Sequence, residues 1–435
     1  MEHPVPVTFS DLNYSVPVKT APDGALQILR GVSGSFRPGR MTALMGPSGS
    51  GKTTLLDLLA GRKSTGTIEG HITMAGKPPT TDDLKQFCGY VEQFDTLVGE
   101  LTVAQMLAYT AELKLPSGTT AAERDSRCQE VLKRLGLESC KDTVIGNALM
   151  RGISGGQAKR VNIALALITR PAILFLDEPT SGLDSHTAND VIVLLKQLAL
   201  EGRTVVCTIH SPTGFAFSQF DDLVMLKGGR KIFEGALSSA KPYFEGLGRG
   251  QFDPNLCSLP EWLVDLTAGK TSHLGAVSDT EAPVELLQLA EKTSVLTSSE
   301  NGDEFAAAFE ASGAKTAADS LHLDLSKAVD TSVIATTPYS PPSQLSKLMT
   351  LLKYRMAAHY KDGQFLGPRL GDKVLFSVLI LTLYWDIGDK TDAKSINSIA
   401  ALTYMICALC GYGAAAFVPS LTLERALFYR ELADG

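Results

Sequence analysis

Cysteine, aromatic side chains and positive charge are all scarce in this sequence. Its 435 residues include seven cysteines, and aromatic residues make up 7% of the chain. An odd, scattered set of cysteines excludes a disulfide framework, and the single C-x-x-C pair, Cys407 and Cys410, has no second pair nearby to complete a zinc site. The formal net charge of -7 argues against a broad phosphate-neutralising surface, so no nucleic-acid partner is expected.

The first residues lack a basic segment followed by an apolar core, so a secretory signal is not expected and the first domain should be cytoplasmic. With 44% hydrophobic and 20% charged residues, the composition excludes a wholly disordered or collagen-like chain. At roughly 150 residues per domain, the length allows about three folding units.

Residues 1–269 alternate short β-rich runs with helical patterns, which is typical of a layered α/β domain. The run of four apolar residues at 173–176 is expected to be a parallel strand buried on both faces. The other predicted strands are 41–45, 71–74, 204–207 and 222–226. Helices are predicted at 103–113, 121–135, 161–168 and 187–200.

Residues 270–342 are rich in Ser, Thr and Ala and carry a net charge of -7, equal to that of the whole chain. We interpret this stretch as an acidic linker. One helix is expected within it, near Glu304–Ala311, and the composition predicts no further structure there.

A connecting helix and two apolar runs follow the linker. Residues 343–366 form a predicted amphipathic connecting helix, and 367–435 form a predicted partial transmembrane domain with spans near 370–387 and 395–423. The first apolar run is short enough to be a buried helix instead, but the second is 29 residues without a charge. Because basic residues flank both spans, the positive-inside rule places both flanks in the cytoplasm, so the chain is predicted to be a multi-pass membrane protein.

A glycine-rich loop lies directly after the first predicted strand of the domain and opens a helix. It fits the pattern G-x-x-x-x-G-K-[ST], whose backbone N–H groups cradle phosphates while the lysine reaches the β/γ-phosphates and the threonine offers its hydroxyl to Mg²⁺. A turn without a ligand is the alternative, which the strand, loop and helix together disfavour. The predicted ATP-binding residues are Gly46, Pro47, Ser48, Gly49, Ser50, Gly51, Lys52, Thr53 and Thr54.

Asp177 and Glu178 follow the buried strand at 173–176. Carboxylates at the carboxyl edge of a parallel sheet meet a ligand held by the neighbouring loop. We expect Asp177 to hold Mg²⁺ and Glu178 to act as the general base or to polarise the attacking water. Taken alone, the two residues could equally be solvated charges that end a strand.

A second anion site is predicted at Ser154, Gly155, Gly156 and Gln157, which open the helix at 161–168. The pattern S-x-x-Q is also a capping box, so a capped helix without a ligand is the alternative. One chain cannot easily bring this helix N-terminus onto its own glycine-rich loop, whereas two chains can.

Together these motifs resemble the ATP-binding cassette of ABC transporters, a P-loop NTPase of α/β fold. The resemblance assigns Ser154–Gln157 as the signature and the pair after the buried strand as Walker B. It also implies that Gln93 approaches Mg²⁺ and the water, that His210 is the switch histidine, and that the D-loop consists of Ser181, Gly182, Leu183 and Asp184. The metal ligands it implies are Thr53, Gln93 and Asp177.

A cassette that precedes membrane helices resembles the G subfamily of white and pleiotropic-drug-resistance type. This implies a half-size transporter that hydrolyses ATP to export a lipid-like or amphipathic substrate as a homo- or heterodimer in a lipid membrane. Since the family has six helices per half, the chain is expected to be truncated after the second. The alternatives are a non-transporting partner that regulates a full-length half-transporter, or a soluble-type ABC ATPase.

Overall fold

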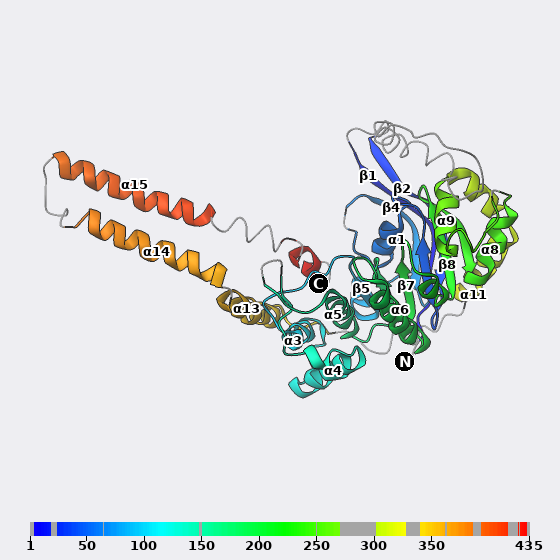
Figure 1. The fold of residues 1–435 in the computed structure, drawn as a ribbon, viewed down its shortest axis with the longest axis horizontal. Helices are drawn as coiled ribbons and strands as arrows, with labels where there is room; N and C mark the ends of the chain where they lie inside the picture. Colours follow the sequence, from blue (N-terminus) through cyan, green and yellow to red (C-terminus); the bar gives the residue numbers. More distant parts are fainter. Residues whose placement is uncertain are drawn as a thin grey trace. The chain divides into compact units, whose positions relative to one another are not determined.

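The computed structural model describes residues 4–18, 24–63, 65–147, 150–248, 250–269, 302–327, 340–361, 363–385, 393–415, 425 and 427–432. The chain divides into two compact units, whose elements are labelled in Figure 1. The first comprises Met1–Asp95, Lys114–Glu138 and Ser154–Pro341. The second comprises Thr96–Leu113, Ser139–Ile153 and Pro342–Gly435.

The first unit is built on a six-stranded sheet of order β5-β6-β7-β3-β8-β9. The five strands from β5 to β8 are parallel, and β9 pairs antiparallel with β8. The parallel strands are buried along almost their whole length, as their apolar runs predict. Their bounds are β3 Met41–Met45, β5 Cys88–Val91, β6 Ile173–Leu176, β7 Thr204–Thr208 and β8 Asp222–Lys227, and β9 covers Arg230–Ala236.

A second, antiparallel sheet of order β2-β1-β4 completes the sheet structure of this unit. Its strands are β1 Val7–Pro17, β2 Ala25–Phe36 and β4 Thr67–Met74. The rings of Phe9 and Phe36 lie 5.4 Å apart in a core that also takes Leu55 and Leu56 from the first helix. This core anchors the helix that follows the glycine-rich loop.

Several helices of the first unit begin at side-chain caps, and two start earlier than predicted: the helix expected at 161–168 begins at Gly155, and the one expected at 187–200 begins at Ser185. Thr120 and Ser154 each form a capping box, and Asp184 caps the helix after the D-loop. The helices are α1 Lys52–Leu59, α2 Thr81–Phe87, α4 Ala121–Arg134, α5 Gly155–Leu167, α6 Ser185–Leu200, α7 Gly214–Ser218, α8 Leu237–Gly246 and α9 Leu259–Ala268, with a short 3-10 turn at Glu138–Cys140.

Part of the predicted linker is folded onto this unit. Residues 302–310 are helical, close to the predicted 304–311, but α11, Gly313–Lys327, is a second helix that the composition does not predict. Phe305 and Phe309 are buried, and α11 packs against β9 and β2. The helix expected near Glu304–Ala311 is thus confirmed, whereas the expectation of no further structure in the linker is wrong for Gly313–Lys327. Residues 270–301 and 328–339 lie outside the described residues.

The second unit contains α3, Val103–Lys114, and α13, Gln344–Lys361, which meet through one carboxylate. Glu112 accepts hydrogen bonds from Lys353 Nζ at 2.8 Å and Tyr354 Oη at 3.1 Å. Burial alone would raise the pKa of Glu112, but these donors lower it below its usual value. The predicted connecting helix thus begins near its expected start and ends at Lys361.

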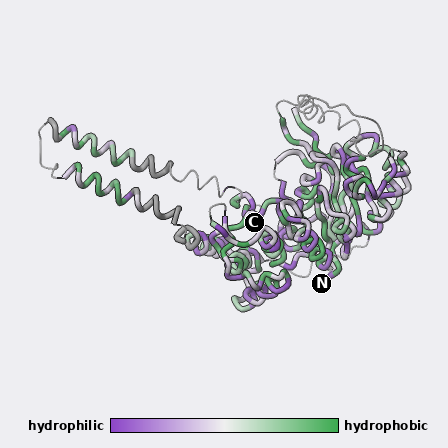
Figure 2. The backbone as a smooth tube through the Cα atoms, in the orientation of Figure 1, coloured by the Kyte–Doolittle hydropathy of each residue, from purple (hydrophilic) through white to green (hydrophobic). Residues whose placement is uncertain are grey.

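Two further helices follow in this unit, α14 Gly363–Leu383 and α15 Ala393–Ala415. Figure 2 shows a run of hydrophobic residues in the described part of α14, where Val374, Leu375 and Leu383 are exposed. Within the described residues, no helix combines the length and apolar character that crossing a membrane requires. The predicted spans near 370–387 and 395–423 extend into 386–392 and 416–424, which lie outside the described residues.

Candidate functional site

The glycine-rich loop joins β3 to α1 and is held open by backbone conformations that favour glycine. Gly46, Gly49 and Gly51 have φ of 145°, 77° and 97°. A Cβ on Gly46 would lie 2.0 Å from the carbonyl oxygen of Leu226 in β8, so the loop is packed directly against that strand. The loop can therefore keep its shape only with glycine at its first position.

The side chain of Lys52 lies across the glycine-rich loop, which leads into α1 at this residue. Its ammonium group donates to the carbonyl oxygens of Gly46 and Pro47 at 2.9 Å each, and the side chain is buried. Burial lowers the pKa of Lys52, and the nearby carboxylates of Glu178 and Asp177 oppose that shift. The lysine is thus a buried cation placed at the centre of a loop of backbone N–H groups, which suits a polyphosphate.

Asp177 extends β6 toward this loop and meets two hydroxyl groups. Its Oδ1 accepts from Thr53 Oγ1 at 3.0 Å and from Thr208 Oγ1 at 2.6 Å. Burial raises the pKa of Asp177, although both hydrogen bonds lower it. A carboxylate and a hydroxyl at hydrogen-bonding distance, beside a phosphate-binding loop, form the oxygen-rich donor set that Mg²⁺ prefers. Thr53 and Asp177 therefore fit that ion.

Glu178 occupies a strained position next to Asp177. Its φ is 44°, in the left-handed region that non-glycine residues rarely adopt, and its backbone N–H donates to Thr208 Oγ1 at 2.8 Å. Its Oε2 accepts from Gln93 Nε2 at 2.8 Å. Gln93 follows β5 at the same edge of the sheet, so the structure brings together two residues that are 85 positions apart.

His210 reaches the loop from the strand on the other side of β6. It follows β7, and its Nε2 lies 3.4 Å from Ser48 Oγ, while Nδ1 lies 3.1 Å from Ser211 Oγ. The imidazole is exposed, so it can contact a ligand bound at the loop. Four strand ends therefore deliver Lys52, Asp177, Gln93 and His210 to one edge of the sheet.

Ser50 gives an independent sign that the loop is shaped for a ligand. Within the part of the chain that the structure describes, its buried hydroxyl has no hydrogen-bond partner. Buried hydroxyl groups are normally paired, and an unpaired one costs about 1–3 kcal/mol. An orphaned donor inside the loop, together with the cation of Lys52, fits phosphate oxygens.

The signature residues lie at the exposed N-terminus of α5. Ser154 Oγ accepts from the N–H of Gln157 at 3.3 Å, and Gln157 Oε1 accepts from the N–H of Ser154 at 2.9 Å. Ser154 and Gly155 are both exposed. The Ser154 N–H is already bonded to Gln157, while the positive end of the helix dipole lies at this exposed N-terminus, where an anion is favoured.

The D-loop lies beside the signature. Asp184 Oδ1 accepts from the N–H of Thr187 at 3.0 Å, and this hydrogen bonding lowers the pKa of Asp184. A Cβ on Gly156 would lie 2.3 Å from Thr187 Cγ2 and one on Gly155 4.0 Å from Leu183 Cδ2. Ser181 and Gly182 are exposed. Gly156 of the signature thus packs closely against Thr187 of α6, the helix that Asp184 of the D-loop caps.

Two functional positions were not found from the sequence. Thr208 supports both Asp177 and Glu178, and Lys159, which is 1% exposed, donates to the carbonyl oxygen of Gln93 at 2.9 Å. Lys159 also pairs with Asp95 at 2.9 Å. A lysine among the apolar residues of α5 is the signal that could have revealed this anchor, since lysine is almost never buried without a partner.

The sequence was also compared with known protein families. Residues 29–181 match the sequence profile of the ABC transporter family. The chain therefore carries an ABC-type ATPase domain, as its motifs predict.

The relatives that align over most of the chain are members of the G family of ABC transporters. Member 47 from Oryza sativa subsp. japonica is 34% identical over 445 residues, which cover 99% of this chain and 30% of that protein. Member 22 from Arabidopsis thaliana is 43% identical over 285 residues, covering 65% of this chain and 37% of the relative. The chain thus spans about a third of the length of these relatives.

Among solved structures, the fold is similar to a dimeric ATP-binding cassette bound to ADP and Pi in a post-hydrolysis state. The two chains are 27% identical, with a TM-score of 0.46, and the match covers 53% of this chain and 98% of that one.

Proposed function

We propose that this chain supplies the ATP-hydrolysing half of a G-family ABC transporter and couples hydrolysis to export of a lipid-like or amphipathic substrate. The observation that carries the proposal is the convergence of hydrogen bonds at one sheet edge, which joins Thr53 to Asp177 and Gln93 to Glu178. G-family relatives over nearly the whole chain support the transport role.

The residues divide the work by position. The loop from Gly46 to Thr54 holds the phosphates, and Lys52 neutralises their charge. Glu178 accepts the proton of the attacking water, and Gln93, bonded to that carboxylate, orients the water. His210 contacts the side of the loop that would face the terminal phosphate. Mg²⁺, held by Thr53, Asp177 and Gln93, would stabilise charge on the phosphate oxygens.

The exposed signature supports a homo- or heterodimer. Ser154 to Gln157 present a helix N-terminus that faces solvent, and an anion there gains from the helix dipole. In the proposed dimer, the nucleotide bound by Lys52 of one subunit meets this signature of the other. The D-loop then lies next to the shared nucleotide, because its Asp184 caps α6, whose Thr187 packs closely against Gly156 of the signature.

The second unit would connect the cassette to the membrane. In this proposal α14 and α15 belong to two spans near 370–387 and 395–423, the cassette is cytoplasmic, and membrane lipid surrounds the spans. The exposed apolar residues of α14 support that placement. The segment 343–366 would transmit movement from the cassette to the spans, with Lys353 and Tyr354 held by Glu112.

The decisive experiment replaces Glu178 with Gln in the purified full chain. Glu178→Gln keeps the hydrogen bond to Gln93 possible but removes the base, so ATP binding should persist while hydrolysis falls about 10²- to 10⁴-fold. The surface variant Glu138→Gln is the matched control and should hydrolyse ATP normally. Hydrolysis by Glu178→Gln at the wild-type rate would contradict the assignment.

Transport is tested separately by reconstituting the chain into lipid vesicles that contain a fluorescent lipid analogue. ATP-dependent movement of the analogue, absent in Glu178→Gln, is the expected result. Hydrolysis without movement would leave the ATPase assignment intact and overturn export by this chain alone, which would favour a regulatory partner of a full-length half-transporter.

A further inference from the structure

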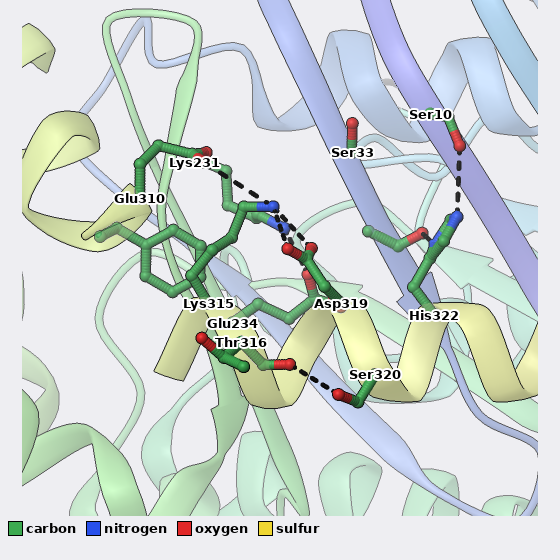
Figure 3. Close-up of polar contacts among 12 residues, drawn as sticks. Ser10, Ser33, Lys231, Glu234, Glu310, Lys315, Thr316, Asp319, Ser320 and His322 are labelled. Atoms are coloured by element: carbon green, nitrogen blue, oxygen red, sulfur yellow. Dashed lines mark hydrogen bonds and ion pairs between the residues drawn. The ribbon is translucent and has the colours of Figure 1, made fainter. Parts of the chain in front are cut away.

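The two helices of the acidic segment are docked on the first unit by specific contacts. Phe309 is fully buried and its ring centroid lies 6.5 Å from that of Phe233 in β9 and 6.2 Å from that of Tyr243 in α8. Figure 3 shows Lys315 of α11 directed at Asp319 and Glu310, and His322 directed at Ser10 of β1, at 3.2 Å. The segment 302–327 is therefore part of the folded unit.

The first of these helices, residues 302–310, packs against the turn between β8 and β9. Asp303 Oδ1 accepts from Arg230 Nε at 2.6 Å, and Lys227 Nζ lies 4.8 Å from the ring centroid of Phe305. Lys227 and Phe305 are each 3% exposed. A Cβ on Gly302 would lie 3.2 Å from the carbonyl oxygen of Lys227. The helix thus contacts both residues that flank the turn.

The same turn supports the phosphate-binding loop from the other side. Its residues Gly228 and Gly229 have φ of 56° and 78°, the conformation of a tight two-residue hairpin turn. The N–H of Gly229 donates to the carbonyl oxygen of Ser50 at 3.3 Å, and Arg30 N–H donates to Gly229 O at 2.9 Å. Gly46 packs against the carbonyl oxygen of Leu226, immediately before Lys227.

We propose that the helix 302–310 is a positioning element for the ATP-binding loop, with Phe305 and Asp303 holding the β8–β9 turn against Ser50 and Gly46. The proposal rests on the proposed ATP-binding role of that loop. Only one turn separates the helix from the loop, and each side of the turn has a defined contact. Phe305 and Asp303 contact Lys227 and Arg230, which flank the turn, so they act on the loop through the turn.

This arrangement predicts a change in nucleotide affinity with little change in the chemical step. If the turn is loosened, the loop can move before ATP binds, so part of the binding free energy is used to order the loop. Glu178 and Gln93 follow β6 and β5, which lie away from the turn in the sheet, so the chemical step should be little affected. KM and Kd for ATP should therefore rise while kcat stays within about twofold.

The test measures Kd for a fluorescent ATP analogue, and KM and kcat for ATP, in the purified full chain. Asp303→Arg should raise Kd about two- to fivefold, as expected for loss of a surface ion pair with added repulsion, and Arg230→Asp in the same chain should restore it. Phe305→Ala should raise Kd about tenfold. Leu323→Ala, on the exposed side of α11, is the control and should leave Kd unchanged.

Hydrogen exchange of the backbone amides in the peptide that covers 222–231 should be faster in each variant than in the wild type, which would show that the turn is more mobile. Faster exchange there with an unchanged Kd would overturn the proposal, as would a fall in kcat at constant KM. A chain whose wild type does not bind ATP would instead contradict the proposed function, so the two failures are distinguishable. If Phe305→Ala does not fold, the charge-swap pair alone decides the matter.

Discussion

The two halves of the nucleotide machinery differ in how they are completed. The half around Lys52 is closed by hydrogen bonds between separate segments, such as Thr53 to Asp177 and Gln93 to Glu178. The half around Ser154 is exposed, and its hydrogen bonds to Gln157 lie within its own capping box. One chain thus preorganises the loop half, whereas the signature half is exposed and, in the proposed dimer, would be completed by the other subunit.

The halves are nevertheless connected by one helix. The N-terminus of α5 carries the open signature, while Lys159, slightly further along the same helix, reaches the carbonyl oxygen of Gln93. Its ammonium also pairs with Asp95, which in turn accepts from Asn162 Nδ2 at 3.0 Å. A movement of the signature therefore has a direct structural route to Gln93, and through it to Glu178.

The largest effect should come from breaking that connection. Lys159→Met removes the ion pair with the exposed Asp95 and the hydrogen bond to the carbonyl oxygen of Gln93, and each hydrogen bond of a charged group contributes about 1.5–3 kcal/mol of unfolding free energy. Since Gln93 loses its anchor, hydrolysis should fall about ten- to a hundredfold through misplacement, while ATP binding changes little. Chemical unfolding, nucleotide titration and steady-state hydrolysis measure these effects.

Lys159→Arg is the matched variant, because it keeps the charge and the donor groups. It should recover most of the stability and part of the rate. Equal rates in Lys159→Met and the wild type, in protein shown to be folded, would mean that the two halves work independently.

A smaller effect is expected from Thr208→Val, which perturbs the closed half alone. The substitution preserves shape but removes the hydroxyl that donates to Asp177 and accepts from Glu178 N–H, at a cost of about 1.5–3 kcal/mol. Burial already raises the pKa of Asp177, and the Thr208 hydrogen bond opposes that rise. Its loss should raise the pKa further.

The sign of the pH effect follows from this shift. In the proposed site Asp177 would bind Mg²⁺ as a carboxylate, so the acid limb of the hydrolysis profile should move to higher pH in Thr208→Val. For folding the sign is opposite: a carboxyl whose folded pKa is raised favours the native state at low pH and loses that contribution as pH rises through it. An acid limb at the wild-type position would show that Thr208 does not set the ionisation of Asp177.

The contrast between the halves also explains what the sequence could predict. The loop, the strand at 173–176 and the capping box at Ser154 depend on neighbouring residues, so local pattern was sufficient to place them. The strand bounds of β3 and β6 agree with the prediction for the same reason. The contacts of Thr208 and Lys159 depend on segments brought together by the sheet order, which no local pattern contains.

The folded part of the acidic segment also could not be predicted from the sequence, because its average composition is misleading. Its composition, rich in Ser, Thr, Ala and acidic residues, predicts no core, yet Phe305 and Phe309 bury two aromatic rings and Ala318 allows α11 to approach β9. A few large side chains at helical spacing were enough to dock the segment. The average composition of residues 270–342 does not reveal these side chains.

The smallest effect should come from Gly156→Ala, which tests the open half. The added methyl would lie 2.3 Å from Thr187 Cγ2, so the D-loop helix must shift. Added methylenes in packed sites cost about 1–3 kcal/mol, and the lower end is expected here because alanine is the better helix former and the site is near the surface. ATP binding should be unchanged and hydrolysis reduced severalfold, measured by titration and steady-state assay.

The pair of positions supplies its own control, since the clash is with a single methyl group. Thr187→Ser removes Cγ2 but keeps the hydroxyl that donates to Asp184 Oδ2 at 2.7 Å, and the next nearest Thr187 atom to the added methyl is 3.6 Å away. Gly156→Ala with Thr187→Ser should therefore regain hydrolysis close to the wild-type rate. If the double variant is as slow as the single one, the clash with Thr187 is not the reason that glycine is needed at 156. Glycine would then be required for contact with the partner subunit, and the difference between the two halves would be larger.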